Sequence, residues 1–187
     1  FGGCVGLLYS ISLPTGGKEH ILQVGTTPQH LSNSITLFKN RAYIGAHEGV
    51  FSCLDLAGIE ESGATPPQNK PGPEINNETG AREDALYPVI PALWTYDSKQ
   101  RPFISSAAVT ESQVIVGCQD KRLYCFAPET GETLWTFTAR GMIDSSPVIC
   151  GDKIIVGSDD GRLYMINTAD GEEVWSYDTG AGIISSP

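Results

Sequence analysis

Serine, aspartate and histidine side chains stand at several points where nucleophilic or metal-assisted chemistry is conceivable. Ser145 and Ser146 present two neighbouring hydroxyls, and Asp144 comes directly before them. A serine nucleophile needs a base within hydrogen-bond reach, and a metal site needs several His, Cys, Asp or Glu ligands at matched spacing. The three histidines of the chain show no ligand spacing, and nothing pairs Asp144 with a base.

The serine pair also stands forty residues earlier, at Ser105 and Ser106. When residues 103–142 are laid on 143–182 without a gap, twelve positions are identical. A period near forty is typical of repeat architectures, in which each unit buries its apolar face against its neighbours. Catalytic residues occur once, whereas repeated residues support a fold. We therefore predict no catalytic, cofactor-binding or metal-binding residue in this chain.

Each copy of the repeat reads as four short strands. In the last complete copy, the runs KIIVGS (153–158) and RLYMIN (162–167) flank Asp159-Asp160-Gly161, a signal for a tight hairpin with positive φ at the glycine. The run EEVWSY (172–177) follows a second turn, and a further run passes through Val148. Four strands per forty residues predict an all-β fold, a β-propeller of four-stranded antiparallel blades.

The register predicts four blade parts and the start of a fifth. Residues 59–91 interrupt the second part with six of the twelve prolines and six acids against two bases, so we expect an insertion without strands. The chain begins and ends inside a blade, which predicts an incomplete arc of roughly four blades from a ring of about seven or eight. The predicted parts are 1–32, 33–104, 105–144, 145–184 and 185–187.

Composition narrows the classes of partner. The chain holds 22 acids and 12 bases, and its net charge of −10 repels a phosphate backbone, which argues against nucleic acid. The apolar runs are only a few residues long, so we predict no membrane span. An apolar fraction of 40% is sufficient for a sizeable core.

Two segments carry a resemblance to a known family. APETGETLW (Ala127–Trp135) and NTADGEEVW (Asn167–Trp175) resemble the tryptophan-docking segment of the PQQ-like, or quinoprotein-type, β-propeller repeat, and ALWTY (Ala92–Tyr96) keeps its end. A glycine in this segment allows a bend that other residues avoid. The following Leu or Val and the Trp are then expected to fill the crevice between blades.

The residues that we expect to build the blade junctions recur between copies and have no predicted chemical role. They are Trp94, Trp135, Trp175, Gly131, Gly171, Gly117, Gly157, Tyr124 and Tyr164.

The resemblance implies a non-catalytic scaffold for protein–protein interaction, similar to the outer-membrane assembly lipoprotein propeller and to propellers appended to multidomain proteins. Expected partners are proteins or the remaining blades of the same protein, and open blade edges predict self-association. The family favours the periplasm or another extracytoplasmic space. The five cysteines, none in a CxxC pair, favour a reducing, cytoplasmic compartment as the alternative.

Two other functions stay open. The first is a fragment of a quinoprotein dehydrogenase, which would use PQQ with calcium and hold its active-site residues outside this sequence. Such enzymes cap the quinone with a vicinal disulfide, and this sequence has no Cys-Cys pair. The second is a propeller that binds a small ligand such as a sugar, because fold alone does not fix function.

Overall fold

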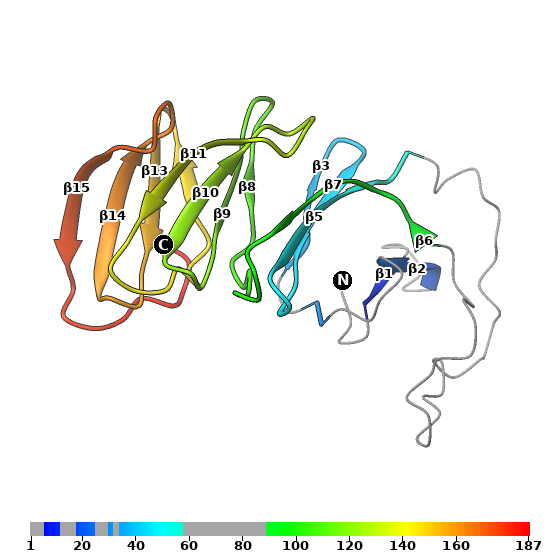
Figure 1. Ribbon diagram of the computed structural model, residues 1–187, viewed down its shortest axis with the longest axis horizontal. Coiled ribbons are helices and arrows are strands. Elements are labelled where there is room, and N and C mark those ends of the chain that lie inside the picture. Colours follow the sequence, from blue (N-terminus) through cyan, green and yellow to red (C-terminus); the bar gives the residue numbers. More distant parts are fainter. Residues whose placement is uncertain (1–5, 12–17, 25–29, 32–33, 58–88) are drawn as a thin grey trace, which may run out of the picture.

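The computed structural model describes residues 6–11, 18–24, 30–31, 34–57 and 89–187 (Figure 1). These residues form fifteen strands and no helix, which confirms the predicted all-β class. Within the same ranges there is accordingly no helix that could cross a membrane.

Three of the four sheets are four-stranded and antiparallel, and their strands follow one another in sequence order. The second sheet contains β3 (Thr36–Phe38), β4 (Arg41–Gly45), β5 (Val50–Asp55) and β7 (Ala92–Asp97). The third sheet contains β8 (Ala108–Val109), β9 (Val114–Gly117), β10 (Arg122–Phe126) and β11 (Thr133–Thr138). The fourth sheet contains β12 (Val148–Cys150), β13 (Lys153–Gly157), β14 (Arg162–Asn167) and β15 (Glu173–Asp178).

The first sheet differs from this pattern. It joins β1 (Leu7–Ile11) to β2 (Lys18–Val24), and β6 (Val89–Ile90) pairs in parallel with β2. The prediction of no strand in 59–91 is therefore wrong for the last residues of that segment, because Ile90 is apolar and is buried beside Val24. Residues 59–88 lie outside the described ranges.

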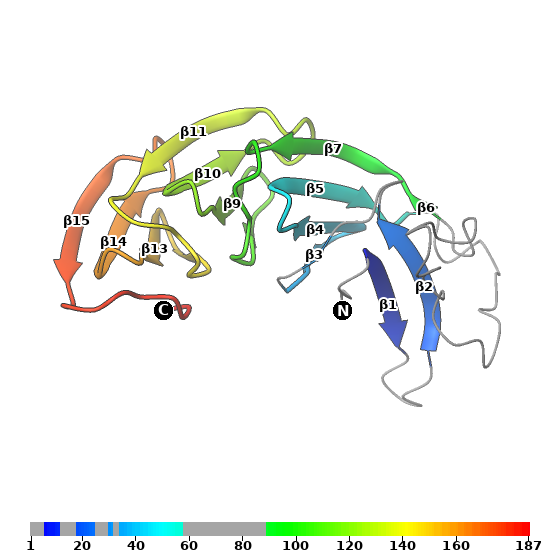
Figure 2. The same ribbon diagram turned by 60° about the horizontal axis from the view of Figure 1, so that its bottom comes forward.

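The four sheets stand side by side in an arc (Figure 2). The last strand of each four-stranded sheet, β7, β11 or β15, lies along the convex side. The connection that leaves this strand returns to the concave side, where the next sheet begins. The described sheets thus form an incomplete β-propeller.

The repeat is visible in the backbone as well as in the sequence. Every sheet has a register shift at the same repeat position, where the strand leading into the last hairpin pairs with its partner. A bulge of this kind adds a residue on one strand and increases the local twist. The shifts fall at Ser10/Ile11, Cys53/Leu54, Cys125/Phe126 and Met165/Ile166.

Alternate residues of the central strands face opposite neighbours. In β10, Tyr124 and Phe126 pack against the second sheet, whereas Leu123 and Cys125 pack against the fourth. Since side chains alternate along a strand, a sheet between two neighbours buries both faces. One apolar core therefore lies at each junction between sheets, and no single core serves the whole arc.

Candidate functional site

Tryptophan residues couple one sheet to the turn of the next. Gly131 has φ +71°, and a Cβ placed on it would lie 2.5 Å from Cδ2 of Trp94. Gly171 has φ +74° and stands in the same relation to Trp135. Glycine is needed at each bend for its backbone angle and for the indole lying on it. Each indole thus rests on a glycine of the following sheet, which lies 37 residues after Trp94 and 36 residues after Trp135 in the sequence.

A single backbone carbonyl receives two hydrogen bonds at the junction of the second and third sheets and again at the junction of the third and fourth. The Trp94 Nε1–H donates to the Pro128 carbonyl over 2.8 Å, and Arg41 Nη1 donates to the same oxygen over 2.9 Å. At the next junction the Thr168 carbonyl accepts from Trp135 Nε1 over 2.9 Å and from Gln113 Nε2 over 2.7 Å. We call this arrangement the shared-carbonyl clamp.

Trp175 has no such neighbour among the described residues. Its exposed fraction is 40%, against 7% for Trp94. Tyr177, two residues later, is 66% exposed, whereas Phe137 at the same repeat position is 9% exposed. The outer part of β15 is therefore left uncovered by the described residues.

The residue before each tryptophan is the extra residue of the register shift and has no cross-strand partner. Leu93 is 45% exposed, Leu134 48% and Val174 45%. The prediction that these side chains fill the crevice is therefore wrong, because the bulge leaves them half-exposed while the tryptophan faces the next sheet.

Gly117 and Gly157 make room for an apolar side chain from the connection that follows the same sheet. A Cβ on Gly117 would lie 2.5 Å from Cγ2 of Ile143, and Ile183 takes the same place at Gly157. The repeated serines bind these glycines, since Ser105 and Ser145 accept hydrogen bonds from their N–H groups over 2.7 and 3.2 Å. Both serines are buried, so they hold the backbone and face no substrate.

Tyr124 and Tyr164 are buried side chains that end on a carboxylate. The Tyr124 hydroxyl donates to Asp120 over 2.5 Å, and the Tyr164 hydroxyl donates to Asp160 over 2.7 Å. Burial, and next the bond to Asp160, raises the pKa of Tyr164 to about 12. Neither phenol is therefore a candidate for acid–base chemistry near neutral pH.

Asp160 also fastens the chain that arrives from the third sheet. Its carboxylate accepts hydrogen bonds from the N–H groups of Arg140, Gly141 and Arg162 over 2.9, 3.2 and 2.9 Å. Burial acts to raise the pKa of Asp160, but the bonds from Tyr164 and from the backbone outweigh it. Its pKa therefore lies below the usual value, and the ionised form is preferred in the folded state.

The cysteines in the described residues form no disulfide. Cys53, Cys118, Cys125 and Cys150 are all free, and only Cys150 is exposed. Burial raises the pKa of the Cys125 thiol to about 12. A thiol with so high a pKa is a poor nucleophile and a poor metal ligand.

The carboxylates of Asp144 and Asp178 already interact with other side chains. Asp144 accepts from Gln119 Nε2 over 3.0 and 3.1 Å, and Asp178 lies 3.3 Å from Arg162. In the described residues no group of three or more His, Cys, Asp or Glu side chains is placed to hold a metal ion.

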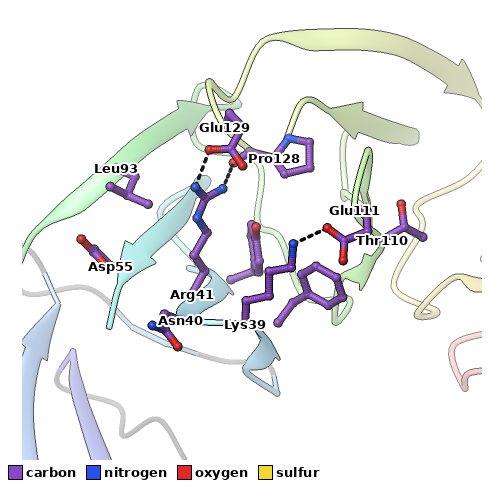
Figure 3. A pocket seen from close by; sticks show the side chains of 11 residues that line it. Lys39, Asn40, Arg41, Asp55, Leu93, Thr110, Glu111, Pro128 and Glu129 are labelled. Carbon is purple, nitrogen blue, oxygen red and sulfur yellow. Dashed lines mark hydrogen bonds and ion pairs between the residues drawn. The ribbon is translucent and has the colours of Figure 1, made fainter. Parts of the chain in front are cut away.

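A pocket of about 430 Å³ opens between the second and third sheets (Figure 3). Two ion pairs cross it, from Lys39 to Glu111 and from Arg41 to Glu129, and Asp55 lies on its other side. The bond to Glu129 raises the pKa of Arg41 above its usual value, and the pKa of Glu129 is lowered by the same bond.

Polar and apolar side chains share the rest of the pocket wall, and Asn40 and Thr110 are among the polar ones. Phe38, Leu93 and Pro128 line it, together with Tyr43, whose side chain is only 1% exposed. The Tyr43 hydroxyl is buried and makes no hydrogen bond within the part of the chain that the structure describes. Burial raises the pKa of Tyr43, so the hydroxyl stays protonated.

The two ends of the sheets carry different charge. The end formed by the β3–β4, β8–β9, β10–β11, β12–β13 and β14–β15 turns is termed the acidic end. Among the described residues of the second to fourth sheets, its acids are Asp55, Glu111, Glu129, Glu132, Asp152, Asp170, Glu172 and Glu173, against Lys39, Arg41 and Lys153.

The opposite end is almost balanced in charge. It contains the β4–β5, β9–β10 and β13–β14 turns and the connections that leave β7, β11 and β15. Its acids are Glu48, Asp97, Asp120, Asp144, Asp159, Asp160 and Asp178, against Lys99, Arg101, Lys121, Arg122, Arg140 and Arg162.

Sequence reasoning missed Arg41 and Gln113, which complete the two shared-carbonyl clamps. They occupy the same repeat position, but Arg, Gln and the Lys153 of the next copy share no residue type that would mark it. The pocket was missed as well, because its residues differ from those at the equivalent positions of other copies. The repeated serines gave a correct signal, since their recurrence indicated a structural role.

Comparison with family models matches residues 91–187 to the model described as outer membrane protein assembly factor BamB. These 97 residues are just over half of the 187-residue chain. Comparison with curated protein sequences finds no match.

Among solved structures, BamB from Moraxella catarrhalis is similar with a TM-score of 0.64 and 16% identity, over 95% of this chain and 44% of that one. The computationally designed protein Ika8 is similar with a TM-score of 0.70 and 13% identity, over 99% of this chain and 47% of the design. The designed protein Ika4 gives 0.63 and 14%, over 90% of this chain and 85% of the design. At these identities the likeness shows the fold, and the chain spans about half of BamB and Ika8.

Proposed function

Since this chain belongs to the PQQ-like β-propeller repeat family described as outer membrane protein assembly factor BamB, we propose that it is a non-catalytic module that binds other proteins. The observation that carries the proposal is the unequal charge of the two ends. Counted over the described residues of the second to fourth sheets, the acidic end holds eight carboxylates against three bases, whereas the opposite end holds seven against six. A one-sided charge of this kind steers and orients a protein with a basic surface.

The way the repeated residues are used supports the same proposal. Most of the tryptophan, glycine, serine and tyrosine residues at equivalent positions contact other parts of the fold, as described above. The turns of the acidic end differ between copies, and most of their carboxylates are exposed. Rigid sheets that present variable turns are a common basis for binding surfaces. The relative named as an assembly factor makes the extracytoplasmic space the proposed location.

Site-specific photocrosslinking in living cells tests this proposal. A photoreactive residue is placed at Glu132 or Asp170 on the acidic end and, as a control, at Arg140 on the opposite end; all three positions are exposed. We expect crosslinks to defined proteins from the acidic end, and we expect fewer of them from purified components as salt rises. Equal crosslinking from both ends, or none from the acidic end, would contradict the proposal.

The quinoprotein alternative has its own readout. PQQ and calcium are added to the purified protein, and the absorbance of a bound quinone and the reduction of a dye are measured. The scaffold proposal expects neither signal. A stoichiometric chromophore together with dye reduction would replace it with an oxidoreductase.

A further inference from the structure

The pocket between the second and third sheets is lined by residues at variable positions of the repeat. Phe38, Arg41 and Asp55 stand where the next two copies have Thr110 and Cys150, Gln113 and Lys153, and Ala127 and Asn167. Of these three copies, only the one that lines the pocket combines a cation with a carboxylate at these positions. The pocket's volume of about 430 Å³ lies in the range of small-molecule sites.

The charges in the pocket favour a neutral ligand. Both cations, Lys39 and Arg41, already pair with carboxylates across the sheet junction. A charged ligand would have to break one of these pairs to form its own, whereas a neutral ligand leaves them intact. The pairs are fixed between two sheets, as Figure 3 shows for Arg41 and Glu129.

The same groups retain unused hydrogen-bonding capacity. A guanidinium has five N–H donors, and Arg41 uses two nitrogens, for Pro128 and Glu129. A carboxylate offers about four acceptor positions, and Asp55 uses Oδ1 for the N–H of Ala57. The pocket therefore offers both donors and acceptors, which is what hydroxyl groups require.

We propose that the pocket binds a saccharide of one or two rings. Its hydroxyls would pair with Arg41 and Asp55, and the C–H face of a ring would lie on the apolar side chains of Phe38 and Leu93. The pocket lies within the acidic end, because Lys39, Arg41, Asp55, Glu111 and Glu129 belong to both. The two proposals can still fail separately, since Leu93→Trp should weaken sugar binding without changing the crosslinks formed from Glu132 and Asp170.

Saturation-transfer NMR on the full chain, with glucose, galactose, N-acetylglucosamine and maltose as probes, tests the proposal. We expect a signal from at least one sugar in the unaltered protein. Leu93→Trp fills the pocket from an exposed position and should weaken binding by about tenfold or more, which equals about 1.4 kcal/mol. The matched control is Leu134→Trp, at the same repeat position outside this pocket, and it should bind as the unaltered protein does.

A second variant tests the same site without introducing a bulky side chain. Asp55→Ala introduces the residue that stands at position 127, and the loss of its acceptor should weaken sugar binding by about three- to tenfold. No signal from any of the four sugars would overturn the proposal, as would equal binding by Leu93→Trp and Leu134→Trp. Binding of arginine amide in place of the sugars would overturn it in favour of a cationic ligand.

Discussion

Trp94 and Trp175 occupy the same position in two copies of one repeat, yet one is buried and the other is not. Trp94 lies on Gly131 and donates to the Pro128 carbonyl, both in the following sheet. Trp175 is 40% exposed. The strands that carry the two residues pair in the same way, including the register shift. The burial of the indole is therefore decided by the neighbouring sheet's turn and not by its own strand.

The largest expected difference is in the cost of removing each indole. Trp94→Ala should lower the free energy of unfolding by about 3–5 kcal/mol, because it empties a buried site and leaves the junction unfilled. Trp175→Ala in the same chain should change it by less than about 1 kcal/mol, because the side chain is already exposed. Urea denaturation followed by circular dichroism measures both. Equal losses would break the comparison.

The glycine that receives the indole should rank next. Gly131→Ala is expected to cost about 2–4 kcal/mol, since it combines a positive φ with a clash against Trp94. Gly151→Ala is the matched control, because its φ is +63° and no atom lies within 4 Å of the added Cβ. It should cost only about 1 kcal/mol. In a Trp94→Ala background the Gly131→Ala cost should fall to the level of the control, and an unchanged cost would show that no clash is involved.

Substitution of Asp160, at the junction between the third and fourth sheets, should have a smaller and pH-dependent effect on stability. The folded-state pKa of Asp160 is lowered, so its contribution to stability is present above the unfolded-state pKa of 3.8 and is lost as the pH falls through the folded-state value. Asp160→Asn should therefore cost about 1–2 kcal/mol at neutral pH and progressively less on acidification. The measurement is the unfolding free energy of both proteins from neutral pH down to about pH 2. A difference that does not change with pH would contradict this assignment.

Removal of the ion pair between Arg41 and Glu129, at the junction of the second and third sheets, should have the smallest effect on stability. Glu129→Gln removes the charge that pairs with Arg41 but leaves the bond from Arg41 to the Pro128 carbonyl. Glu129 is 74% exposed, so we expect only a slight loss of stability that disappears at high salt. Thermal unfolding at low and high sodium chloride tests this. A large, salt-independent loss would show that the pair, and not the indole, holds the junction.

The sequence was most informative where the repeat constrains the backbone. The turn at Gly161 was predicted from Asp-Asp-Gly, and it has φ +84°. The short strands around it were predicted from their β-branched and aromatic residues. These signals are local, so a single copy of the repeat is enough to give them.

Contacts between copies were less accessible from sequence. The sequence did not reveal that Leu134 is half-exposed while Trp135 faces the next sheet, because the two residues lie at a bulge and the regular alternation of a strand is interrupted there. The pocket depends on Arg41 and Glu129, which are 88 residues apart. No local pattern joins two such positions, and no repeat position marks them. β6 was missed because two residues are too few to show a period.

The shared-carbonyl clamp has a consequence for how such repeats diverge. Its acceptor is a main-chain oxygen, carried by a proline at one junction and by a threonine at the other. Substitution of that residue does not remove the oxygen, and one of its two donors has been exchanged between arginine and glutamine. Copies can therefore lose most of their common residues and still stack in the same geometry. This tolerance explains how a fold of this kind persists after its sequence similarity has faded.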